Sequence, residues 1–240
     1  MILPAQVLPL YSIIWLLDLF KYGYAKKGCS MHLYIIAQYL NLPGLNKDRL
    51  FKLGLEWLSR GDQVTVFTMN EGTGLQLGKR KVGLAQSGGL NTVTFNVDYS
   101  LQASRSRKLY AYYKFACMVK KQGLQLPRPD LILAVSPPLT ALWPALKLKE
   151  HFKVPLVVEI RELWPDALVQ RGSLSGSLPI KAVTRFEQQV YEKADRIIAG
   201  GTGIADAIKA RQPGRVKVTV IPEGLDERDM IRLYNEAMAR

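Results

Sequence analysis

Short apolar segments alternate along the chain with longer segments in which apolar residues recur every three or four positions. In the clearest case, the apolar run Leu131–Val135 lies between Asp130 and Ser136, a helical pattern follows over about Leu139–His151, and a second apolar run covers Leu156–Val158. Short apolar runs bounded by proline and polar residues are typical of buried strands. Two such strands joined by a helix predict a right-handed βαβ unit in a parallel sheet.

The same alternation extends over most of the chain. Further strands are predicted at His32–Gln38, Gln63–Thr68, Asn91–Val97, Asp195–Ala199 and Val216–Ile221, and further helices at about Lys47–Arg60, Ser104–Gly123, Ile180–Ala194 and Ile204–Arg211. The polar, glycine-rich region between residues 70 and 100 is expected to hold only one of these strands. We therefore predict an α/β fold: a Rossmann-like parallel sheet with helices on both faces, its strands in the order 3-2-1-4-5 onward.

Residues 1–30 do not follow this pattern. Their uninterrupted apolar part, Leu10–Leu17, is too short to span a bilayer, which takes about 20 apolar residues. No basic residues precede it, as they would in a signal peptide. We expect an N-terminal extension without a fold of its own. The alternative is an interfacial helix that places residues such as Trp15 and Phe20 at the level of the lipid headgroups.

Charge and cysteine content narrow the range of partners. The chain carries 33 Lys and Arg against 20 Asp and Glu, a net charge of +13. This charge fits phosphates, an anionic membrane leaflet or nucleic acid, and equally a generally basic protein. Two cysteines and two histidines offer neither a disulfide framework nor metal-ligand spacing. We therefore expect a reduced, cytoplasmic protein that needs no metal and no cofactor.

Candidate site residues follow the predicted strands. Open α/β sheets bind ligands outside the carboxyl ends of their strands, and Ser136 and Glu159 stand there, together with Arg161 and Glu162 in the loop that follows. The carboxylate of Glu162 could accept a hydrogen bond or a proton from a substrate hydroxyl, and Arg161 could bind a phosphate. The alternative is a structural pair between Arg161 and Glu162 that holds the loop.

Two further positions precede predicted helices. Gly44 lies between the first strand and the next helix, and Thr202 follows Gly200-Gly201 after the strand that ends at Ala199. Glycine at such places lets backbone N–H groups approach a phosphate at a helix N-terminus. An ordinary turn at Gly44 and an N-cap role for Thr202 are the structural alternatives.

The predicted helix Ser104–Gly123 mixes cations with aromatic residues. Its cations are Arg105, Arg107, Lys108, Lys114, Lys120 and Lys121. A core-facing helix with a solvated basic back would explain them. They could also form a membrane-surface patch, since each cation near anionic lipid adds about 1 kcal/mol to membrane binding. In a third interpretation the cations bind the phosphates of a nucleic acid while the aromatic residues stack on its bases.

One motif carries a family resemblance. Ser136-Pro137-Pro138 followed by a helix, and then VPLVVEIRELWPDALVQRG from residue 154, resembles the N-terminal domain of family 4 glycosyltransferases of the GT-B fold. The loop is most similar to the subgroup that acts in bacterial surface-polysaccharide and O-antigen synthesis. The resemblance spans residues 31–226. It leaves 1–30 as an extension and 227–240 as the start of an interdomain linker or a terminal helix.

The resemblance implies an activity, and it implies that acceptor and donor are bound by two different domains. It implies retaining transfer of a sugar from a nucleotide-diphosphate donor to a lipid-linked saccharide acceptor, on the inner face of the membrane. This chain would be the acceptor half, with Glu162 catalytic and Arg161 on the acceptor phosphate. The donor-binding domain would be missing from it or form a separate subunit, so we expect no turnover by the chain alone and no nucleic-acid partner. The rival hypothesis is a non-catalytic membrane- or nucleic-acid-binding module.

Overall fold

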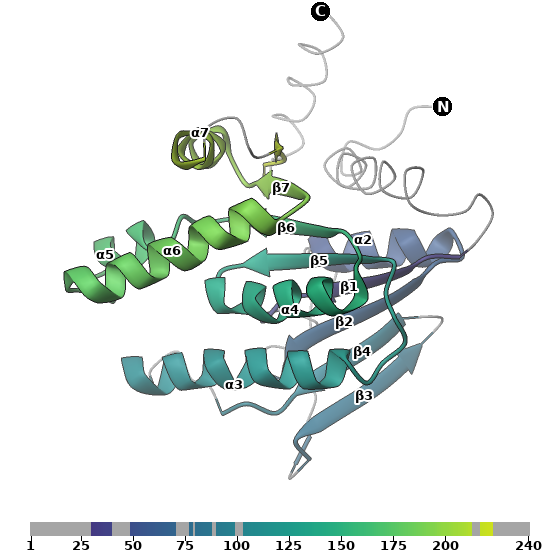
Figure 1. Ribbon diagram of the computed structural model, residues 1–240. Coiled ribbons are helices and arrows are strands. Elements are labelled where there is room, and N and C mark those ends of the chain that lie inside the picture. Colours follow the sequence, from purple (N-terminus) through teal and green to yellow (C-terminus); the bar gives the residue numbers. More distant parts are fainter. Residues whose placement is uncertain are drawn as a thin grey trace, which may run out of the picture.

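A single eight-stranded sheet organises the protein (Figure 1). The computed structural model describes residues 30–39, 49–70, 77–78, 80–87, 90–98, 103–212 and 217–222. The strands are β1 His32–Ile36, β2 Gln63–Met69, β3 Val82–Ser87, β4 Leu90–Phe95, β5 Leu131–Ser136, β6 Leu156–Ile160, β7 Arg196–Ala199 and β8 Val218–Val220. Their order is β3-β4-β2-β1-β5-β6-β7-β8. The predicted order is therefore confirmed for the seven strands β4-β2-β1-β5-β6-β7-β8, that is, for every strand except β3.

Helices cover both faces of the sheet, as predicted. They are α2 Arg49–Ser59, α3 Arg105–Gly123, the short 3-10 helix η2 Leu139–Ala141, α4 Leu142–Phe152, α5 Asp166–Gln170, α6 Ser177–Lys193 and α7 Thr202–Arg211. Helices α3, α4 and α6 pack on one face and α2 on the other (Figure 1). Helix α5 was not predicted, because the segment after Trp164-Pro165 is too short to show a helical period.

The edge strand β3 was missed by the sequence analysis. It pairs antiparallel with β4, whereas the other neighbouring strands are parallel to each other. Its one large apolar residue, Leu84, is 68% exposed. An edge strand that buries little apolar surface needs no apolar run, so hydrophobicity alone does not reveal it.

The two-residue period of the strands divides the apolar core into two clusters. On β5, Ile132 and Ala134 face the cluster formed with α3, α4 and α6, while Leu133 and Val135 face the cluster formed with α2. On β6 the same division places Val157 on the α2 side. Residues two positions further along a strand share a face, so Ser136 and Glu159 follow opposite faces of the sheet.

The basic residues of helix α3 differ in exposure: Arg105, Arg107 and Lys121 are exposed, whereas Lys108, Lys114 and Lys120 are half-buried. The buried residues of the helix include Ala111, Phe115 and Val119, which recur every four positions and form a single stripe against the sheet. Lys108, seven positions before Phe115, continues this stripe at its N-terminal end, whereas Arg107, Lys114, Lys120 and Lys121 lie off it. The interpretation of Ser104–Gly123 as a core-facing helix is therefore confirmed.

Candidate functional site at the carboxyl edge of the sheet

Three neighbouring strands end together where the predicted site residues lie. The backbone N–H of Arg161 donates to the Ser136 carbonyl (3.0 Å), and that of Gly200 donates to the Ile160 carbonyl (3.0 Å). These bonds join the ends of β5, β6 and β7. The arrow of β5 in Figure 1 points to this edge. Ligands of open α/β sheets bind at such an edge.

Glu159 and Arg161 form a pair on the α2 side. Glu159 is fully buried, and its Oε1 accepts a hydrogen bond from Arg161 Nε at 2.9 Å, with the Arg161 side chain 25% exposed. A buried carboxylate is costly without a countercharge. The structural Arg–Glu pair that the sequence suggested therefore exists, but it joins Arg161 to Glu159 and not to Glu162.

Glu162 has a different partner, Arg171. The Arg171 Nη2 lies 2.5 Å from Glu162 Oε1, and the two side chains are 58% and 29% exposed, respectively. The hydrogen bond and the charge of Glu162 raise the pKa of Arg171. The second oxygen of Glu162, Oε2, is buried and has no hydrogen-bond partner in the part of the chain that the structure describes. One carboxylate oxygen is thus fixed, and the other is not used within the described protein.

The remaining candidates do not join this pair. Ser136 is fully buried, and its Oγ has no hydrogen-bond partner among the described residues. Gly44 lies outside the described residues. Thr202 is exposed at the first position of α7, and the N-cap is Gly201. The interpretation of Thr202 as the N-cap is therefore wrong, because the helix begins one residue earlier than a threonine cap requires.

A buried ion network that the sequence analysis did not detect holds the loop after Glu162. Arg211 of α7 contacts Glu187 Oε2 at 2.5 Å, binds the Asp166 carboxylate and donates to the Trp164 carbonyl at 3.4 Å. Tyr191 donates to Glu187 Oε1 at 2.8 Å. The only sequence signal was a glutamate one turn after Val183, within the apolar stripe of α6. The network connects α6 and α7 to the loop that carries Glu162.

The six cations of α3 differ in their immediate surroundings. Arg105 and Lys108 border a cavity beside α6. Lys114 and Lys121 line a groove of about 730 Å³ against β3 and β4. Lys120 lies 5.4 Å from the ring centre of Trp143 on α4, a cation–π contact. Arg107 is exposed.

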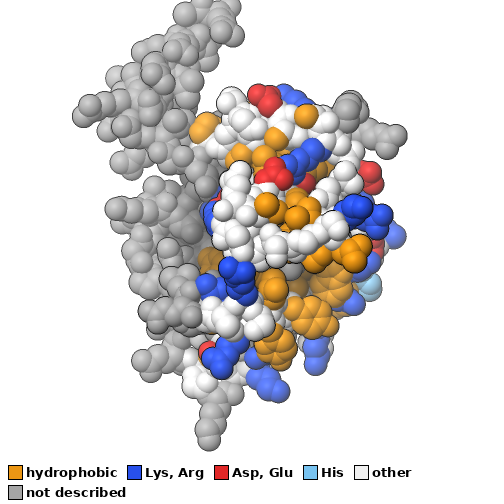
Figure 2. Space-filling view, turned by 90° about the vertical axis from the view of Figure 1, so that its left-hand side faces the viewer, with side chains coloured by type: hydrophobic (Ala, Val, Ile, Leu, Met, Phe, Trp, Pro, Cys, Tyr) orange, Lys and Arg blue, Asp and Glu red, His pale blue; other side chains and the backbone are white. Residues whose placement is uncertain are grey.

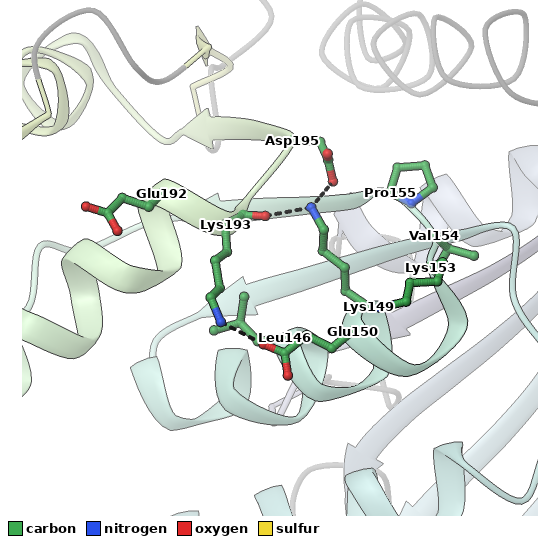
Figure 3. A pocket seen from close by; sticks show the side chains of 9 residues that line it. All are labelled: Leu146, Lys149, Glu150, Lys153, Val154, Pro155, Glu192, Lys193 and Asp195. Carbon is green, nitrogen blue, oxygen red and sulfur yellow. Dashed lines mark hydrogen bonds and ion pairs between the residues drawn. The ribbon is translucent and has the colours of Figure 1, made fainter.

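Another depression, drawn in Figure 3, lies at the opposite edge of the sheet, where β6 begins. It measures about 570 Å³. In Figure 3 Lys149 of α4 reaches toward Asp195, and their Nζ and Oδ2 atoms are 2.5 Å apart. Hydrogen bonds from Lys147 and Lys193 lower the pKa of Glu150 to about 2. The carboxylates of Glu150 and Asp195 are paired with lysines. We therefore interpret the depression as a structural junction between α4, α6 and β6.

Replacing Asp195 by Ala should therefore reduce stability and leave ligand binding at the other edge unchanged. Asp195 Oδ2 also accepts the backbone N–H of Leu156 at 2.7 Å, and a partly buried donor left without an acceptor costs about 1–2 kcal/mol. Urea denaturation followed by circular dichroism measures the change. Asp195→Asn retains an acceptor oxygen and should lose less. An equal loss in the two variants would contradict the role given to the hydrogen bond.

No helix among the described residues is long and apolar enough to cross a membrane. Within the same ranges, no group of three or more His, Cys, Asp or Glu residues could hold a metal ion. The site as described thus consists of a carboxylate paired with arginine, a buried serine, and a loop held by ion pairs.

Solved structures share the fold at low sequence identity. Sucrose-phosphate synthase from Thermosynechococcus elongatus superposes with a TM-score of 0.54 and 15% identity, over 82% of this chain and 49% of that one. Trehalose-6-phosphate synthase, OtsA, gives 0.51 and 11% over 82% and 50%. Arabidopsis thaliana UGT89C1, complexed with UDP-L-rhamnose, gives 0.51 and 12% over 82% and 50%. The chain therefore spans about half the length of these GT-B proteins.

Sequence comparison identifies the family directly. A search among curated proteins gave no match. The family described as "Glycosyl transferase 4-like domain" matches residues 49–224, which is more than half of the chain. The match includes β2 to β8, Glu162 and Arg171. The protein belongs to the glycosyl transferase 4-like family.

Proposed function

We propose that this chain is the acceptor-binding half of a retaining glycosyltransferase that transfers a sugar from a nucleotide-diphosphate donor to a lipid-linked saccharide. The observation that carries the proposal is the family match over residues 49–224, in a chain that spans about half the length of structural neighbours such as sucrose-phosphate synthase. Residues 31–226 would form the domain itself. A donor-binding half, continuous with this chain or separate from it, would complete the active site.

Glu162 is the proposed catalytic residue of this half. Arg171 fixes one of its oxygens, which leaves the other to accept a hydrogen bond or a proton from the acceptor hydroxyl. As the acceptor oxygen bonds to the sugar carbon, the bond from that carbon to the nucleotide diphosphate would break on the same face of the sugar, which retains the configuration. The hydroxyl proton would move to Glu162, and the nucleoside diphosphate would leave with the donor-binding half. Arg161, on the same loop, is the proposed contact for the acceptor phosphate. Its Nε binds Glu159, which holds the guanidinium group at the edge of the sheet, and a guanidinium group can bind a phosphate through two parallel hydrogen bonds.

The donor side of the proposal is supported by a structural neighbour. UGT89C1 was solved in complex with UDP-L-rhamnose, a nucleotide-diphosphate sugar. The diphosphate leaving group needs electrostatic stabilisation in the transition state. We propose that this stabilisation comes from the donor-binding half, so the chain alone should bind acceptor and not turn over.

A peripheral location on the inner face of a membrane is part of the same proposal. Leu109, Tyr110 and Tyr113 of α3 are 58%, 65% and 63% exposed, beside the exposed cations Arg105 and Arg107. Figure 2 shows hydrophobic side chains gathered near the middle of the face at the carboxyl edge, with Lys and Arg around them. Apolar groups surrounded by cations suit an anionic leaflet.

Calorimetric titration of the chain tests the acceptor role. A monosaccharide joined through diphosphate to a farnesyl chain should bind, whereas a UDP-sugar should bind at least tenfold more weakly. A duplex DNA of random sequence serves as the control polyanion. Binding of the DNA but not of the lipid-linked sugar would overturn the proposal in favour of a nucleic-acid-binding module, and tight binding of the UDP-sugar would move the chain to the donor side.

A further inference from the structure

A cavity of about 360 Å³ lies beside the Glu162 loop, between α3, η2 and α6. Its walls are mostly apolar and include Leu139, Trp164, Leu174 and Phe186. The volume lies within the range of about 300–1,000 Å³ that is usual for small-molecule sites. Glu162, Arg161 and Arg171 do not line this cavity, so the proposed function leaves it without an occupant.

The charge at its border is of one sign. Arg105 and Lys108 line the cavity, and none of the described residues that line it is acidic. Both cations stand in the first turn of α3, which contains no acidic side chain. The N-terminal end of a helix carries partial positive charge, so cations there are unfavourable unless an anion is nearby. The border therefore fits an anionic group, while the interior fits hydrocarbon.

The walls argue against a peptide or a nucleobase inside the cavity. Among the described residues that line it, Thr140, Ser173, Tyr112 and Trp164 are the only ones with polar side-chain groups besides the two cations. A peptide backbone or a base would lose its hydrogen bonds to water without finding enough partners. A hydrocarbon chain loses none. The occupant with matching chemistry is a hydrocarbon chain that ends in a phosphate.

We propose that the cavity binds the phosphate-proximal part of the isoprenoid chain of the lipid-linked acceptor, with Arg105 and Lys108 at the phosphate next to that chain and Arg161 at the phosphate next to the sugar. The proposal rests on the proposed function for the identity of the acceptor. Trp164 and Ser173 line the cavity, and each is two residues from a member of the Glu162–Arg171 pair. A chain in the cavity would thus place its head group beside Glu162.

The apolar lining also continues to the protein surface. Ala182 lines the cavity on α6, and one turn before it Leu178 is 77% exposed. Leu109, at the α3 side of the cavity, is 58% exposed. A chain longer than the cavity could therefore leave it between these two leucines and continue into a membrane.

The test fills the cavity without touching Glu162. Ala182 is exposed on α6, so Ala182→Trp should fold, and its indole should occupy the opening. Ala210→Trp on α7 is the matched control, because Ala210 is also exposed and does not line the cavity. Calorimetry with farnesyl phosphate should show at least tenfold weaker binding for Ala182→Trp and unchanged binding for Ala210→Trp.

The charged border is tested separately. Arg105→Glu combined with Lys108→Glu should weaken farnesyl phosphate binding about tenfold, whereas Lys209→Glu with Lys217→Glu, which makes the same charge change at exposed positions elsewhere, should not. Neither inorganic phosphate nor farnesol alone should bind as well as farnesyl phosphate. Equal binding of inorganic phosphate would identify a free-anion site and overturn the proposal.

Two compounds separate this inference from the proposed function. If Ala182→Trp binds farnesyl phosphate as the unchanged chain does, the cavity proposal is wrong. If the chain then still binds the farnesyl-diphosphate-linked sugar, the proposed function stands without it. If farnesyl phosphate binds and is blocked by Ala182→Trp, but the sugar-linked compound does not bind, the cavity is a lipid site and the acceptor role is wrong.

Discussion

Sugar transfer should fall about 10²- to 10⁴-fold when Glu162 is replaced by Gln, the range typical for loss of a general base. The glutamine keeps the size of the side chain and an oxygen for Arg171, but it cannot accept a proton from the acceptor hydroxyl. The assay uses extracts of source cells that lack the endogenous gene, supplemented with the purified chain. These extracts supply any separate donor-binding half. Labelled sugar transferred from the nucleotide to the lipid fraction is counted.

Three comparisons make the result specific. Glu162→Asp retains a carboxylate but withdraws it by one methylene, so partial activity is expected, because small misplacements of reacting groups are costly. Glu192→Gln changes an exposed carboxylate on α6 at the far edge and should have no effect. Farnesyl-diphosphate-linked sugar should bind Glu162→Gln nearly as well as the unchanged chain. Full activity of Glu162→Gln would reduce Glu162 to a structural partner of Arg171.

Buried strands made the fold predictable from sequence. Leu131, Ile132 and Leu133 are inaccessible to solvent, and a strand buried on both sides must be apolar at successive positions. Strand β3 does not meet this condition, since it lies at the edge with Leu84 exposed. The predicted boundaries of the central strands are close to those observed, for example Leu131–Val135 against Leu131–Ser136 for β5, because an apolar run begins and ends where the burial does.

The site was less predictable, because side-chain partners depend on which face a residue occupies. Neighbouring residues Arg161 and Glu162 appeared to be a pair, yet each binds a residue elsewhere, Glu159 and Arg171 respectively. Both residues lie in bends after β6, where no strand or helix period predicts the direction of a side chain. Pairing between Glu187 and Arg211, 24 positions apart, depends on how α6 and α7 pack, which no local pattern records.

Replacing Arg211 by Met should lower the free energy of unfolding by about 3–5 kcal/mol, the cost of leaving a buried charge without its partner. Glu187 is fully buried, and Arg211 is 23% exposed. Besides Glu187, the arginine binds Asp166 and the Trp164 carbonyl, so the Glu162 loop loses its support as well. Lys209→Met, on the same helix and exposed, should change stability by less than about 0.5 kcal/mol.

Removing both charges should restore most of this loss. Replacing a buried ion pair by apolar residues of similar volume is often neutral for stability. The double variant Glu187→Leu with Arg211→Met should therefore recover most of the about 3–5 kcal/mol that Arg211→Met loses, because no unpaired charge remains buried. A double variant as unstable as Arg211→Met would show that the loss came from the Asp166 and Trp164 contacts. In that case the Glu187 charge would not be its cause.

The dependence on pH gives an independent check of the same mechanism. Burial raises the pKa of Glu187 above its usual value of 4.5, although Arg211 and Tyr191 oppose the shift. For a raised pKa the folded state holds its proton longer than the unfolded state, so stability falls as pH rises from the usual value through the raised one. Without Arg211 the pKa should rise further. The deficit of Arg211→Met in urea denaturation should therefore be smaller at pH 5 than at pH 8, and equal deficits would exclude Glu187 ionisation as its source.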